Sequence, residues 1–136
     1  MYKRQTWGYA ADMGRVDVGF DPARADGVPE AYEDTGVIDW DRDGQPGATV
    51  QIDVPVFRNV ELHITQRSRA ILAGAVQADG SIDGNATLIE FEQSVLGASN
   101  RFFTYTPDVT PLADLGGFRM KPVPADTTCA SLRRQG

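Results

Sequence analysis

The feature that most constrains the fold is the alternation of apolar and polar residues after position 48. Apolar residues fall at every second position of 49–57 and again of 60–65, which is the period of a half-buried strand. Short polar connections separate these runs, and strands joined so closely pair antiparallel, because a parallel crossover needs about a dozen residues. The pattern therefore predicts consecutive antiparallel strands.

Three further runs extend this series. Residues 70–77 form a mostly buried run, and Asp79-Gly80 favours a hairpin turn of type I′ into a strand over 81–92, where Gly84 permits a bulge. Residues 101–106 predict a fifth strand before the prolines that follow. We expect Arg67-Ser68-Arg69 to separate two strands, and Pro55 to mark an edge strand or a bulge.

The expected fold class is all-β: an antiparallel meander of about five strands forming a half-open barrel or a small sandwich, with a long irregular acidic N-terminal segment. No long stretch carries the apolar stripe of an amphipathic helix, which argues against α/β and bundle folds. The length of 136 residues suits one domain. Its expected parts are an irregular acidic loop region at 6–48, the meander at 49–106 and an irregular tail at 107–136 that packs on the sheet.

The opening residues 1–5 read as the translation of a sequencing adapter of the kind found at the ends of metagenomic reading frames. We therefore expect the true N-terminus, with a signal peptide, to have been lost by truncation. The use of arginine in place of lysine, with many glycines and alanines, is typical of a GC-rich bacterial genome.

Charge and hydropathy limit the classes of partner that we expect the chain to bind. Nineteen acidic residues against thirteen basic ones give a net charge of −6, which argues against nucleic acid as a partner. The longest run without polar side chains, residues 70–76, is too short for a transmembrane helix. The lone Cys129 is either an inert thiol or half of a disulfide with a lost partner.

The sharpest local signal is an acidic loop in which Asp39, Asp41 and Asp43 alternate before Gly44. A loop curled around a cation presents alternate side chains inward, and glycine allows the sharp turn. Hard carboxylate oxygens at this spacing suit Ca²⁺. The competing interpretation is a solvated acidic turn, because Asp and Gly are also good turn formers.

Residues 39–47 resemble the start of the calcium loop in EF-hand, dockerin and thrombospondin type 3 proteins, whereas the whole chain is not identified with any family. In an EF-hand the twelfth loop position is a bidentate glutamate, but here it is Val50. The further ligands must therefore come from elsewhere. The expected set is listed here: Asp39, Asp41, Asp43, the Gln45 carbonyl, Glu33 and Asp34, with Asp53 as an additional candidate.

The sequence signals for other functional sites are weaker than that of the acidic loop. His63 is the single histidine and is expected on an exposed sheet face with Glu61. The aromatic residues could line a cavity for an apolar ligand, although core packing is their commoner role. These residues are Phe91, Phe102, Phe103, Tyr105 and Phe118.

The sequence favours a non-enzymatic, extracytoplasmic bacterial β-domain: periplasmic, outer-membrane-associated or secreted. We expect it to be calcium-stabilised and to act as a binding or structural module. One alternative is a lipocalin-like carrier of a small apolar ligand; the other is a hydrolase using Glu61, His63 and Glu90. The partner is accordingly a protein or a small apolar ligand.

Overall fold

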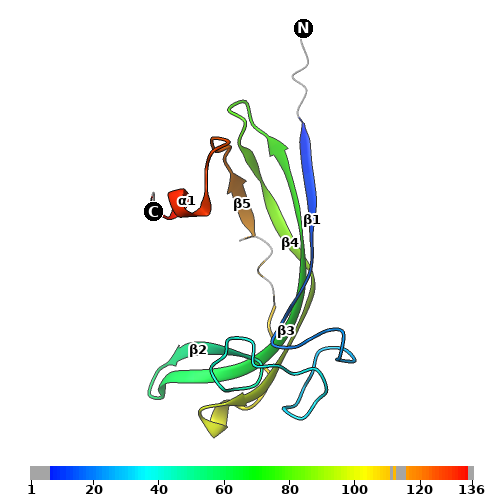
Figure 1. Cartoon of the computed structure of the whole chain (residues 1–136), viewed down its shortest axis with the longest axis vertical. Coiled ribbons are helices and arrows are strands. Elements are labelled where there is room, and N and C mark those ends of the chain that lie inside the picture. The colour runs from blue at the N-terminus through cyan, green and yellow to red at the C-terminus, as the bar shows by residue number, and fades with distance from the viewer. Residues whose placement is uncertain (1–6, 111, 113–115, 135–136) are drawn as a thin grey trace.

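The chain folds into one open antiparallel sheet of five strands, as the computed structural model shows (Figure 1). The structure describes residues 7–110, 112 and 116–134. The strands are β1 (Gly8–Val18), β2 (Ala48–Val54), β3 (Arg58–Val76), β4 (Ile82–Ala98) and β5 (Gly117–Met120). A 3-10 turn, η1 (Arg101–Phe103), and a short helix, α1 (Cys129–Arg133), complete the described elements. The all-β expectation is confirmed, and the sheet does not close.

The long strand β3 organises the sheet. Its neighbour along one edge is β4, and β5 pairs with the outer edge of β4. Along its other edge, β2 pairs with residues 58–64 and β1 with residues 66–75. The strands β1 and β2 therefore lie end to end, and residues 19–47 form an excursion that leaves the sheet and returns to it.

Several strand predictions were wrong in detail. The residues Arg67-Ser68-Arg69 do not separate two strands but lie inside β3, because Arg67 pairs with Asp17 and Arg69 with Asp12 across the ladder to β1. The strand β1 lies in the region expected to be irregular, and β5 lies in the expected tail. Residues 101–106 hold η1 instead of a strand.

The edge strand expected at Pro55 is confirmed, because β2 pairs with β3 alone among the described strands. The turns of β2–β3 and β3–β4 differ in detail from expectation. Pro55 lies just after β2, in a turn where the Phe57 amide donates to the Val54 carbonyl. At the second turn Gly80 has φ of 83° and its amide donates to the Gln77 carbonyl. Positive φ at Gly80 but not at Asp79 is typical of a type I turn followed by a bulge, not of type I′.

The sheet bends sharply where both neighbours of β3 carry a bulge. The register of β1 shifts between Asp12 and Arg15, and that of β4 shifts beside Leu88 and Glu90; both shifts lie opposite Arg69 and Ala70. Bulges increase local twist and bend a strand, so this level of β3 divides the sheet into two halves (Figure 1). Gly84, where a bulge was expected, instead pairs in register with Gly74.

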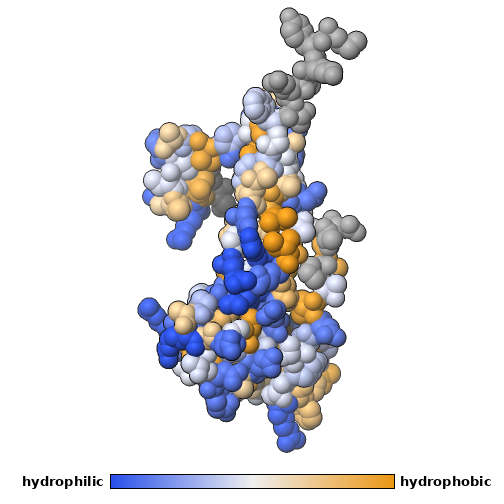
Figure 2. Space-filling view, turned by 90° about the vertical axis from the view of Figure 1, so that its right-hand side faces the viewer, coloured by the Kyte–Doolittle hydropathy of each residue, from blue (hydrophilic) through white to orange (hydrophobic). Residues whose placement is uncertain are grey.

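The two halves differ in burial. We call residues 8–12, 70–76, 82–88 and 117–120 the arm; no residue in it is buried. The rest of the sheet, together with the excursion, we call the base. The base holds the core of Ala48, Ile64 and Val95, with Val18 and Leu62 packed against it. Apolar side chains form a band on one exposed face in the upper part of the molecule (Figure 2).

Candidate metal centre

The excursion is fixed to the sheet at both of its ends by glycines. Gly19 and Gly47 have φ of 84° and 81°, a region that L-residues with a Cβ rarely adopt. A Cβ at either position would collide with the carbonyl oxygen of Ile64. Local sequence thus brings the acidic loop back against the middle of β3.

The excursion also covers the base of the sheet. Phe20 is 1% exposed, and the Arg67 guanidinium lies 5.4 Å from the centre of its ring. The fully buried Thr65 hydroxyl donates to the Pro29 carbonyl at 2.6 Å. The ring of Tyr32 occupies the space beside Gly97 where a Cβ would lie. An irregular segment therefore supplies the second layer of the core.

The acidic loop is closed by backbone contacts. The Trp40 amide donates to the Gly47 carbonyl at 3.0 Å, and the Gly47 amide donates to the Ile38 carbonyl at 2.7 Å. Arg42 and Gly44 both have positive φ, 62° and 85°, which curls the intervening chain tightly.

The three aspartates bind amides of their own loop and of β2. Asp39 accepts from the amides of Asp43 at 3.1 Å and Gly44 at 3.0 Å. The Asp41 carboxylate accepts from the Thr49 amide at 2.8 Å, which ties the loop to β2. These bonds orient the three carboxylates toward one region.

Asp43 is connected to β3 through Thr49. The Thr49 hydroxyl donates to Asp43 Oδ2 at 2.5 Å and lies 3.1 Å from His63 Nδ1. A hydroxyl carries one proton and the carboxylate only accepts, so His63 Nδ1 donates to Thr49. The Thr49 hydroxyl and the Gln45 amide together lower the pKa of Asp43 below its ordinary value, which keeps this carboxylate charged.

Asp39, Asp41 and Asp43 together form a group that could hold a metal ion. Each offers a carboxylate oxygen, and these oxygens lie within 4.8 Å of one another. All three residues are exposed, so an ion could enter from solvent. Hard oxygens on alternate residues of a curled loop are the ligand type of Ca²⁺ and Mg²⁺ rather than of transition metals.

The other predicted ligands lie differently. Asp34 accepts from the amides of Glu30 at 2.8 Å and Ala31 at 3.0 Å, and so closes a separate turn. Glu33 and Asp34 are outside the aspartate group, as is Asp53. The amide of Gln45 donates to Asp43 at 2.8 Å, which holds the Gln45 backbone next to the group.

The position of His63 corrects an expectation. The exposed face predicted for it is wrong, because His63 is 5% exposed and the excursion covers that side of β3. No sequence signal marked Thr49 and His63 as supports of the acidic loop. The tie between them follows from the register in which Thr49 lies opposite His63.

The structure does not bring Glu61, His63 and Glu90 together. Glu90 lies opposite Arg69, eight positions along β3 from Glu61, which is about 26 Å at the usual strand rise of about 3.3 Å. Glu90 is instead paired with Arg15 at 3.1 Å.

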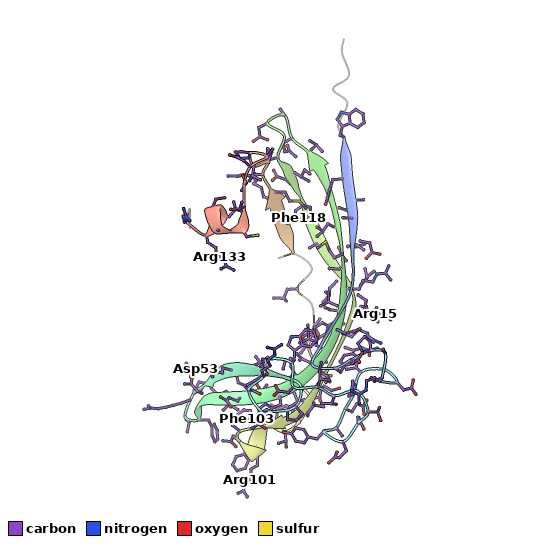
Figure 3. The ribbon with its side chains drawn as sticks, viewed as in Figure 1. Arg15, Asp53, Arg101, Phe103, Phe118 and Arg133 are labelled. Atoms are coloured by element: carbon purple, nitrogen blue, oxygen red, sulfur yellow. The ribbon has the colours of Figure 1, made fainter. Side chains whose placement is uncertain are left out.

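The aromatic residues also fail to line one cavity. Phe118 contacts Tyr9 in the arm, whereas Phe102 and Phe103 contact Phe57 at the far end of the base (Figure 3). A cavity of about 340 Å³ beside Phe91 is lined mainly by polar residues, among them Glu30, Glu92 and Gln93. That lining does not favour an apolar ligand.

Comparison of the chain with protein-family models, curated proteins and solved structures found no match. Among the described residues, no helix has the length and apolar character needed to cross a membrane.

Proposed function

We propose that this chain is a non-enzymatic bacterial β-domain that binds Ca²⁺ in its acidic loop and uses the ion to order the excursion against the sheet. The observation that carries the proposal is the convergence of Asp39, Asp41 and Asp43 to within 4.8 Å. Three carboxylates so close repel one another, and a divalent cation between them removes that repulsion.

The loop is also coupled to the core. Asp41 and Asp43 both bind Thr49, and Thr49 binds the buried His63. A cation that fixes these aspartates therefore stabilises the excursion, which buries its own Phe20 and covers Thr65 of β3. In this role the ion is structural, and the ordered excursion makes the domain suitable as a binding or structural module.

The expected affinity for Ca²⁺ supports a proposal for the cellular compartment. Few carboxylates on an exposed loop give the weak binding of extracellular modules, with dissociation constants of about 10⁻⁴–10⁻³ M. Such sites fill only where free calcium is close to millimolar. We accordingly propose an extracytoplasmic location, which is periplasmic, outer-membrane-associated or secreted.

Titration calorimetry with CaCl₂ tests the proposal on the wild type and on Asp41→Asn and Asp43→Asn. Each substitution keeps an oxygen that can accept from Thr49 but removes a charge. We expect binding by the wild type and at least about tenfold weaker binding by either variant. Asp53→Asn, on β2 and outside the group, is the matched control and should bind as the wild type does. No heat from the wild type, or equal loss in the control, contradicts the proposal.

A further inference from the structure

The outer edge of β1 is a long strand edge without a strand partner among the described residues. The sheet order β1-β3-β4-β5 places β1 outermost. The Val76 amide donates to the Trp7 carbonyl at 2.9 Å, so positions 7, 9 and 11 direct their backbone groups toward β3. In an antiparallel ladder the alternate residues, Gly8, Ala10 and Asp12, direct theirs outward.

The bulge after Asp12 changes which residues face outward. Beyond it, Val16 and Val18 lie opposite Ser68 and Gln66. These two residues are an even number of positions from Val76, so their backbone groups also point toward β1. Val16 and Val18 therefore face β3, and Arg15 and Asp17 direct their backbone groups outward.

This change makes β1 complementary to itself about a two-fold axis between Met13 and Gly14. In a second, antiparallel copy of β1, Asp12 lies opposite Arg15 and Ala10 lies opposite Asp17. Every one of these residues directs its backbone groups outward, so the copies can exchange backbone hydrogen bonds. Without the bulge, this register would set outward groups against inward ones.

The side chains match in the same register. On one face, Tyr9 meets Val18 of the second copy and Ala11 meets Val16, so apolar residues lie opposite apolar residues. On the other face, Asp12 lies opposite Arg15, so opposite charges face each other across the axis, which repeats this pair. Within each chain the two side chains also pair with Arg69 and Glu90. Arg15 lies near the bend of the sheet (Figure 3), where its side chain is exposed.

The surface of the chain leaves room for such an interface. The strand β1 begins in the arm, where no residue is buried, so the sheet is accessible to a partner there. A standard protein–protein interface takes about 800 Å² from each partner.

We propose that the partner of this edge is a second copy of the chain, and that two copies join through β1 in the register that sets Asp12 opposite Arg15. The pairing extends the sheet across the two-fold axis and covers an edge that would otherwise be open to aggregation.

Sedimentation equilibrium tests the dimer, with Ala10→Pro to block the edge. The amide of Ala10 points away from β3, so proline there removes no bond within the chain, and proline is tolerated on edge strands. We expect the wild type at twice the chain mass of 14.8 kDa. Ala10→Pro should raise the dissociation constant at least about tenfold, because the two-fold axis removes the same hydrogen bond twice. The matched control Ala10→Thr keeps the amide and should leave the dimer intact.

A cysteine pair tests the register. In a Cys129→Ser background, Ala11→Cys with Val16→Cys should form a disulfide-linked dimer, because these positions lie directly opposite each other across the axis. Ala11→Cys with Val18→Cys is the mismatched control and should stay unlinked. A monomer at every concentration, an equal effect of Ala10→Pro and Ala10→Thr, or equal cross-linking by both cysteine pairs overturns the proposal.

Discussion

Gly19 and Gly47 lie against the same backbone carbonyl, that of Ile64, from opposite ends of the excursion. One glycine takes the chain out of the sheet where β1 ends, and the other returns it where β2 begins. The acidic loop is thereby held beside the buried centre of the base, although its own residues are exposed.

We predict that Gly47→Ala destabilises the fold by about 2–4 kcal/mol, combining the cost of a positive φ with a collision against backbone. Gly27→Ala is the matched control, because Gly27 has φ of 87° but open space around it. The control should cost only about 1–2 kcal/mol. Urea unfolding measures both, and equal losses would show that the close approach to Ile64 contributes nothing.

The ion pair between Arg67 and Asp17 joins β3 to β1 at 2.6 Å with both side chains largely shielded from water. Asp17→Asn should lower the free energy of unfolding by about 2 kcal/mol, because the guanidinium loses its charged partner in a poorly solvated place. The exposed pair of Arg15 and Glu90 supplies the comparison, and Glu90→Gln should cost less than about 1 kcal/mol. Thermal and urea unfolding would refute this ranking if the exposed pair proved the costlier to break.

The carboxylate of Asp12 should titrate abnormally. A hydrogen bond from Arg69, and next the amide of Gly14, lower the pKa of Asp12 from 3.8 to about 2. A depressed folded-state pKa means that the bond stabilises the fold above the unfolded value, near pH 4. This contribution is lost as the pH falls toward 2. Carboxyl-detected NMR titration should find the low midpoint in the wild type and a midpoint near the ordinary value in Arg69→Gln. An unshifted wild-type midpoint would rule out the bond.

The all-β class could be predicted because period-two alternation and short turns act locally. Val60, Leu62 and Ile64 lie in one strand as the alternation predicted, although burial does not alternate there because His63 and Thr65 are buried as well. The turn at Gly80 was located correctly for the same reason, although its type was not.

The errors arose where distant residues decide the outcome. Arg67 and Arg69 continue a strand only because acids 50 and 57 positions earlier in the sequence neutralise them across the ladder, which the local pattern does not reveal. His63 was expected to be exposed because strand alternation does not say which face a long irregular segment will cover. The aspartate group was predictable, since ligand spacing is local, whereas its support by Thr49 depends on strand register.

Hydrogen–deuterium exchange with and without Ca²⁺ tests the central claim most directly, that a cation held by Asp39, Asp41 and Asp43 orders the excursion. The amides to follow are those of Asp43, Gly44, Gln45 and Thr49, which donate to these carboxylates. We predict that millimolar Ca²⁺ slows their exchange and that of the adjoining excursion, and that Asp43→Asn abolishes this slowing while Asp53→Asn preserves it. Exchange in the wild type that is unchanged by Ca²⁺ would contradict the account.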